Sequence, residues 1–162
     1  MIHRLIPHPG LSALLVIVWM VMVNDVTFGT LFLGLVTGLL VPLFTAAYWP
    51  GRPRVRFVPG IAYLGLVIAD IIVANFQVAR IVLFMPRDKI CSAWVTVPLD
   101  LHSPEAITLL AGTITMTPGT LTADMSACGR ALLIHSLHAP DPDAVRDDIK
   151  ARYESRLKRI FE

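Results

Sequence analysis

Apolar and polar positions divide this chain into two unlike halves. Residues 11–23 and 26–49 are two nearly unbroken apolar runs, separated by the polar pair Asn24-Asp25. The second run is long enough to cross a hydrocarbon core of roughly 30 Å at 1.5 Å per residue. A polar pair between two such runs is typical of a tight turn. Residues 1–50 are therefore predicted to form a membrane helical hairpin.

Glycines mark one face of the second apolar run. Gly29, Gly34 and Gly38 recur at close to helical spacing. Small residues in such a stripe let a neighbouring helix approach closely in a membrane. The stripe therefore predicts a helix contact on this face.

A basic linker follows the hairpin at residues 51–60. Arg52, Arg54 and Arg56 form the densest positive cluster near the apolar runs. Cytoplasmic loops of membrane proteins carry an excess of Lys and Arg. We therefore expect this linker on the cytoplasmic side and the turn between the first two helices on the outside.

The third apolar run, residues 61–85, has two open interpretations. It is long enough to span, but Arg87 and Lys89 follow it directly, so spanning would place positive clusters on both sides of the membrane. A helix that lies in the membrane plane or is steeply tilted keeps every positive cluster inside, and we favour it. The alternative is a true span.

A narrow polar stripe runs along this third helix. Tyr63, Asp70 and Gln77 are spaced by seven, with Arg80 close to the same face. If the helix spans, the stripe faces a partner subunit, and Asp70 needs a partner or a wet cavity because an unpaired charge costs several kcal/mol there. Three roles are therefore possible for Asp70: docking to a partner, proton relay, or simple exposure on an interfacial helix. Of the two functional roles, docking is favoured over proton relay.

Residues 86–162 have the pattern of a small α+β domain. Residues 90–99 are β-rich, and the helix after them has Ser103 as N-cap and Pro104 in its first turn. Thr117-Pro118-Gly119-Thr120 has the residues of a type II turn. Residues 120–126 and 131–137 are predicted to form a strand hairpin, and Asp141-Pro142 to begin the last helix. The predicted order is β-α-β-β-α, and the last helix has an apolar stripe at Val145, Ile149, Tyr153, Leu157 and Ile160.

Charge and cysteine content narrow the function classes. Only seven of the charged residues lie before residue 86, so the N-terminal half is strongly apolar and the C-terminal half has the composition of a soluble domain. A net charge of +2 gives no reason to expect nucleic-acid binding. Two cysteines match no metal or disulfide framework. No nucleophile elbow, P-loop, dinucleotide fingerprint or HExxH is present, so we predict no catalytic residue, cofactor, metal or small-molecule substrate.

Two further segments carry candidate chemistry. Threonine hydroxyls and free carbonyls at a helix end are hard oxygen donors that could hold Na⁺, but we favour the interpretation that they satisfy backbone groups. The threonines are Thr108, Thr113, Thr115, Thr117, Thr120 and Thr122. His135 and His138 are three apart on a predicted strand end, where neighbouring side chains alternate in direction, so they are not expected to form a metal pair.

Four blocks in this order carry a family resemblance. The segments ANFQVARIV (74–82), ITMTPGTLTADMS (114–126) and LLIHSL (132–137), followed by a charged final helix, resemble MnhE, the E-type component of the Mrp (Mnh, Pha) multisubunit Na⁺/H⁺ antiporters. The resemblance covers the whole chain. The motif positions that it marks are Asn75, Thr117, Pro118, Gly119, Thr120 and His135.

The resemblance implies an accessory, non-catalytic subunit of a cation/proton antiporter complex in the bacterial plasma membrane. Its partners would be other antiporter subunits and membrane lipid, with its C-terminal domain in the cytoplasm. The turn at Pro118 and Gly119 would present a docking surface. A stand-alone membrane-anchored adaptor with a cytoplasmic protein-binding domain is the alternative.

Overall fold

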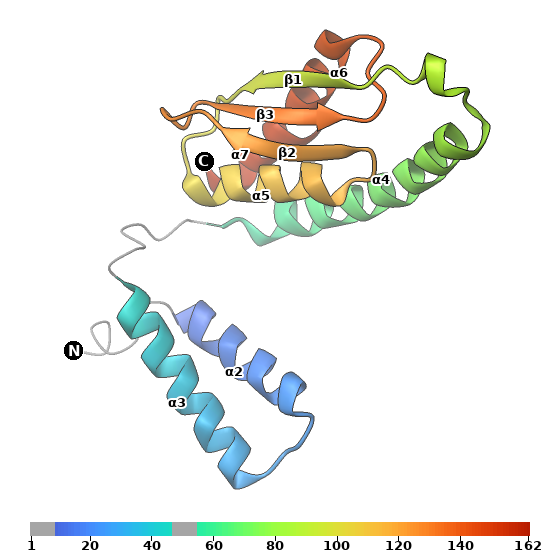
Figure 1. Ribbon diagram of the computed structural model, residues 1–162. Helices are drawn as coiled ribbons and strands as arrows, with labels where there is room; N and C mark the ends of the chain where they lie inside the picture. The colour runs from blue at the N-terminus through green and yellow to red at the C-terminus, as the bar shows by residue number, and fades with distance from the viewer. Residues whose placement is uncertain (1–8, 47–54) are drawn as a thin grey trace. The chain divides into compact units, whose positions relative to one another are not determined.

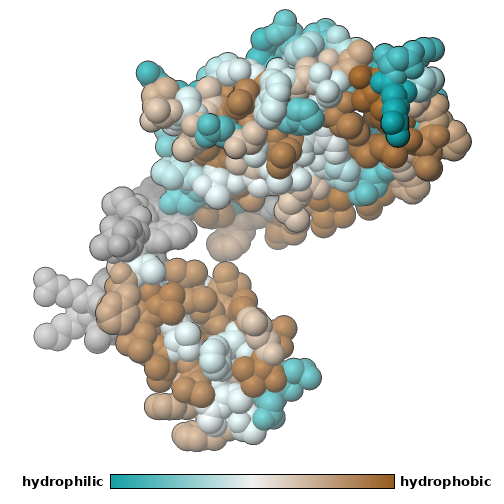
Figure 2. All heavy atoms as spheres, in the orientation of Figure 1, coloured by the Kyte–Doolittle hydropathy of each residue, from teal (hydrophilic) through white to brown (hydrophobic). Residues whose placement is uncertain are grey.

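The computed structural model describes residues 9–46 and 55–162, in two compact units that divide after Arg52 (Figure 1). Of the predicted positive cluster only Arg56 is described, since Arg52 and Arg54 lie outside these ranges. The first unit contains helices α2 (Pro9–Val23) and α3 (Phe28–Thr45). Figure 2 shows the surface of both helices as largely hydrophobic. This is the predicted helical hairpin.

The hairpin turn is built from local polar groups. Asn24 has φ 50°, a left-handed conformation that Asn tolerates. Thr27 caps α3 in a capping box with Thr30, whose hydroxyl also donates to the Asp25 carbonyl over 3.0 Å. The turn is therefore held by hydrogen bonds among its own residues.

Two of the three stripe glycines face α2. A Cβ added at Gly34 would lie 3.0 Å from Cδ1 of Trp19, and one at Gly38 would lie 2.9 Å from the Ser12 carbonyl oxygen. A Cβ at Gly29 would meet only the hydroxyl of Thr27, at 4.0 Å. The predicted close helix approach is thus present, and it is confined to the later two glycines.

The second unit joins one long helix to the α+β elements in the predicted order. The sheet is antiparallel with strand order β1-β3-β2, and a bulge interrupts β2 near Asp124. The elements are α4 (Phe57–Phe84), η2 (Arg87–Lys89), β1 (Ala93–Pro98), α5 (Pro104–Met116), β2 (Thr120–Met125), β3 (Ala131–Ser136), α6 (Pro142–Ile149), η3 (Lys150–Glu154) and α7 (Ser155–Phe161). The coarse fold class, apolar helices followed by a small α+β region, is confirmed.

Helix α4 belongs to the same core as the sheet. In Figure 1 it runs beneath α5 and α7, on the side away from the strands. Tyr63 and Val67 of α4 are buried with Leu110 of α5, Ile134 of β3 and Leu157 of α7. The compact unit therefore begins well before residue 86, where the sequence suggested that the α+β domain starts.

The start of α4 also differs from the prediction. The helix begins at Phe57, four residues before the predicted run, and includes Pro59 and Gly60. A proline in the first helical turn costs no hydrogen bond, because the first four N–H groups have no partner within the helix. The Pro-Gly pair therefore lies inside the helix.

The last helix contains a π-helical segment, η3, between α6 and α7. Its apolar stripe steps by four residues from Val145 to Leu157, and each such step overshoots an α-helical turn by about 40°. The wider π turn compensates for this drift, so that Ile149, Tyr153 and Leu157 are all buried.

Candidate functional site

The Pro118-Gly119 turn packs directly against α4. Thr120 N–H donates to the Thr117 carbonyl over 3.2 Å, and Gly119 has φ 92°, as the third position of a type II turn requires. A Cβ added at Gly119 would lie 2.9 Å from Cγ2 of Val78. Both the backbone angle and the close approach therefore select glycine.

Threonine hydroxyls around this turn are bound to the chain's own carbonyls. Thr120 Oγ1 donates to the Ile114 carbonyl over 2.7 Å, and Thr117 Oγ1 to the Thr113 carbonyl over 2.8 Å, which satisfies the end of α5. The other predicted threonines, Thr108, Thr113, Thr115 and Thr122, donate to backbone carbonyls in the same way. These hydrogen bonds match the structural role, satisfying backbone groups, that the sequence analysis favoured over a Na⁺ site.

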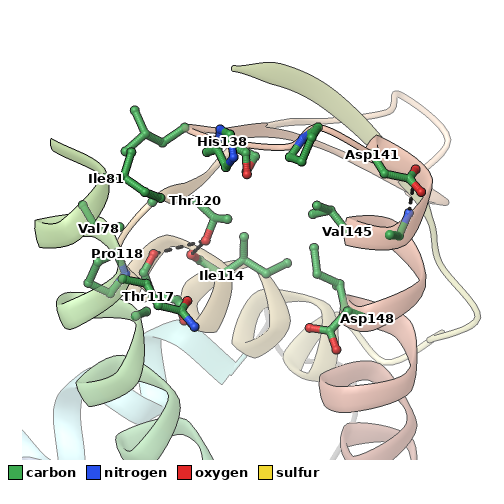
Figure 3. Close-up of a pocket in the computed structure, with 18 of the residues that line it drawn as sticks. Val78, Ile81, Ile114, Thr117, Pro118, Thr120, His138, Asp141, Val145 and Asp148 are labelled. Atoms are coloured by element: carbon green, nitrogen blue, oxygen red, sulfur yellow. Dashed lines mark hydrogen bonds between the residues drawn. The ribbon is translucent and has the colours of Figure 1, made fainter. Parts of the chain in front are cut away.

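A groove of about 460 Å³ opens beside the turn. Figure 3 shows the turn and α4 on one wall and α6 on the opposite wall. Its lining combines the C-terminal half of α4, the end of α5, the turn, the end of β3 with the chain after it, α6 and one residue of η3. These residues are Ala74, Gln77, Val78, Ile81, Ile114, Thr117, Pro118, Gly119, Thr120, Ser136, Leu137, His138, Pro140, Asp141, Ala144, Val145, Asp148, Ile149 and Tyr153. Five of the predicted site residues, Gln77 and the four turn residues, therefore meet here.

Charged groups of the groove lie on the α6 side. Asp141 caps α6, with Oδ1 accepting the N–H groups of Asp143 and Ala144 over 3.0 and 3.2 Å. Asp148 lies on the α6 wall, below Val145 and across the groove from the wall formed by α4 and the turn (Figure 3). Within residues 9–46 and 55–162, Asp148 forms no ion pair. The groove is thus apolar with one acidic wall.

Asp70 has its partners within its own chain. Arg152 Nε donates to Asp70 Oδ2 over 2.7 Å, a second guanidinium nitrogen donates to Oδ1, and the Tyr153 hydroxyl donates to Oδ2 over 3.0 Å. Burial and the hydrogen bond to Asp70 raise the pKa of Tyr153 to about 12. The hydrogen bond to Asp70 likewise raises the pKa of Arg152. Because Tyr153 also lines the groove, this cluster connects the groove to the middle of α4.

A second polar cluster fixes the π-helical segment to the sheet. Buried Glu154 accepts the backbone N–H groups of Asp100 and Leu101 at Oε1, over 2.6 and 3.3 Å. Lys150 donates to Glu154 Oε2 over 2.8 Å and to Asp100 Oδ2 over 2.9 Å. The η3 segment therefore points Arg152 toward α4 and Glu154 toward the chain after β1.

The remaining predicted positions lie away from the groove. Asn75 is exposed on α4, and its amide donates to the Ile71 carbonyl over 2.8 Å. His135 lies on β3 across from Trp94, with ring centroids 4.9 Å apart. Arg80 is exposed. Asn75, His135 and the turn therefore do not form one site, and their roles in docking stay predictions.

Comparison with known proteins identifies the family of this chain. A family model described as "Na+/H+ ion antiporter subunit" matches residues 12–160. The chain belongs to this family. Na⁺/H⁺ antiporter subunits are components of multisubunit membrane transporters, so the partners of this chain are other antiporter subunits.

Relatives of this antiporter subunit match it over nearly their whole length. A probable K⁺/H⁺ antiporter component of Rhizobium meliloti, an E-type subunit, is 35% identical, over 96% of this chain and 97% of the relative. The E-type subunit of a Na⁺/H⁺ antiporter of Alkalihalophilus pseudofirmus is 27% identical, over 93% and 95%. The family resemblance read from the sequence is confirmed.

A solved structure shares the fold. A chain of an archaeal respiratory membrane complex, the membrane-bound sulfane sulfur reductase, superposes on this antiporter subunit with a TM-score of 0.74 and 26% identity. The match covers 98% of this chain and 99% of that chain. The fold therefore also occurs within a respiratory membrane complex.

Proposed function

We propose that this chain is an accessory, non-catalytic subunit of a cation/proton antiporter, which supports assembly and activity by docking through the groove beside Pro118. The observation that carries the proposal is that the motif turn is closed by a backbone hydrogen bond and forms part of one wall of an apolar groove. The polar groups beneath it are engaged within the chain: Asp70 with Arg152, and Glu154 with Lys150. These features suit a binding surface.

Pro118→Ala tests this docking role. We expect the variant subunit to insert normally, whereas the complex is uncoupled or disassembles, because the turn loses the fixed φ that holds its docking surface. Native electrophoresis of solubilised membranes measures complex size, and cation-dependent dissipation of a pH gradient in everted vesicles measures antiport. Pro104→Ala, in the first turn of α5 and outside the groove, is the matched control. Normal size and antiport in Pro118→Ala membranes would refute the docking role.

We further propose that α4 lies along the cytoplasmic membrane surface and that the α+β domain is cytoplasmic. Asp70 sits near the midpoint of α4, so a spanning α4 would carry the Arg152 pair and the adjoining Arg156 to the membrane centre, at high cost. In the in-plane arrangement its apolar face meets lipid, and its polar stripe meets its own domain. The exposed large apolar residues of α4 are Phe57, Val58, Ile61, Leu64, Ile68, Ile72, Val73, Phe76, Val82, Leu83 and Phe84.

Thiol labelling tests this sidedness. Cys128 is exposed in the β2–β3 turn, and hydrogen bonding to Ser126 lowers its pKa to about 7, so its thiolate reacts readily at neutral pH. We expect a membrane-impermeant thiol reagent to leave a chain with Cys128 as sole cysteine unlabelled in intact cells and to label it in everted vesicles. A chain with only Arg54→Cys is the control for the linker. Labelling of Cys128 but not position 54 in intact cells would make α4 a true span.

A further inference from the structure

We propose that the groove receives a basic segment from a cytoplasmic loop of a neighbouring subunit, with an apolar side chain in the groove and a Lys or Arg against Asp148. The proposal rests on the proposed docking function and names the chemistry of the partner. Two features of the groove carry it, its apolar interior and its acidic wall, together with the proposed in-plane position of α4.

Apolar side chains line the interior of the groove from both walls. Val78 and Ile81 of α4 face Val145 of α6, with Ile114 of α5 between them (Figure 3). The volume of about 460 Å³ is that of a cleft able to enclose several side chains. An interior of this kind favours an apolar anchor residue.

The acidic wall offers an exposed carboxylate, that of Asp148. Asp147 is paired with Arg146 over 2.9 Å, whereas Asp148 has no such pair in the part of the chain that the structure describes. The neighbouring Arg152 is already bound to Asp70 by two hydrogen bonds. A basic group on the partner would therefore complement Asp148, and an acidic one would be repelled.

The position of α4 selects which partner segments reach the groove. Val78 and Ile81 lie on the C-terminal half of α4, so an in-plane α4 brings the groove to the cytoplasmic surface of the membrane. Short cytoplasmic loops of multi-pass subunits are enriched in Lys and Arg. Cytoplasmic loops near the groove would therefore carry positive charges that complement the acidic α6 wall.

Charge reversal tests the proposal in the assembled complex. We expect Asp148→Lys to lower the fraction of intact complex about tenfold or more on native electrophoresis, and Asp148→Asn to lower it less. Asp147→Lys makes the same charge change one residue away and outside the groove, and should leave assembly near normal. Equal effects of Asp148→Lys and Asp147→Lys would overturn the proposal.

Photo-crosslinking identifies the occupant. With p-benzoylphenylalanine at Val145 in the full complex, we expect crosslinked peptides from a Lys- or Arg-containing cytoplasmic loop of another subunit. Reversal of that residue to Asp should restore assembly of Asp148→Lys. Crosslinks to lipid alone, or to an acidic segment, would overturn the proposal. If Pro118→Ala disrupts the complex while Asp148→Lys does not, docking stands and the basic partner is excluded.

Discussion

Asp70→Leu is expected to destabilise the second unit by about 2 kcal/mol, because it leaves the Arg152 charge and the Tyr153 hydroxyl without their acceptor. Breaking a fully buried pair costs about 3–5 kcal/mol, but 44% of the Arg152 side chain is exposed, so water compensates part of the loss. Thermal unfolding of the full chain in detergent should show a Tm roughly 8 °C lower. Asp70→Asn keeps the shape and one acceptor oxygen, and should cost less.

A double variant separates structure from transport at this pair. Asp70→Leu combined with Arg152→Met removes both charges, and we expect it to recover most of the lost stability. If Asp70 serves only to hold α4 to the last helix, antiport recovers together with stability. If Asp70 relays protons, the double variant is stable but inactive. Additive losses in Tm would show instead that the two side chains do not interact.

Local signals were sufficient where a feature depends only on neighbouring residues. Ser103 accepts the Ala106 N–H over 3.4 Å, and Asp141 caps α6, as the sequence predicts. The Pro118-Gly119 turn was predictable for the same reason, since a type II turn favours proline at its second position and needs a residue such as glycine, which tolerates positive φ, at its third. These elements account for the correct order β-α-β-β-α.

Pairings between residues far apart in the chain could not be predicted from the sequence. Asp70 was predicted to need a partner or a wet cavity if α4 spans the membrane, but Arg152 lies 82 positions further along the chain, and no local pattern connects them. In the sequence, Asp148 is not distinguished from Asp143 and Asp147, because acidic residues near the start of a helix generally favour its dipole. Its place in the groove depends on how α4 and α6 are brought together, which the folded unit alone determines.

Residues that belong to the same sequence motif do not all lie at the same site. Asn75 and Gln77 are two residues apart on α4, yet only Gln77 lines the groove, because such residues point in different directions on a helix. His135 and Ser136 are likewise adjacent on β3, and only Ser136 faces the groove. A function can therefore be inferred for a motif residue only once its secondary-structure element, and the face of that element on which it lies, are known.

Gly38→Leu should open the helical hairpin, at a cost of about 2–3 kcal/mol. A Cβ at position 38 would lie 2.7 Å from Cγ2 of Val16 and 2.9 Å from the Ser12 carbonyl oxygen. The contact to Ser12 is to backbone, so rotating a side chain does not relieve it, and the helices must separate. Helix association in membranes depends on this close packing, because lipid is as apolar as the helix surface. We therefore expect less of the variant chain in the complex.

Ser12 reports on the opening directly. Its hydroxyl oxygen is buried and makes no hydrogen bond within the described residues. Ser12→Cys, in a chain without Cys91 and Cys128, should react slowly with N-ethylmaleimide in detergent, and about tenfold faster when Gly38→Leu is added. Gly29→Leu inserts the same side chain into the same helix, where a Cβ meets nothing closer than 4.0 Å, and should leave the rate unchanged. Equal rates in the two leucine variants would mean that the Gly38 contact does not hold the hairpin closed, and that the partner subunits must hold it instead.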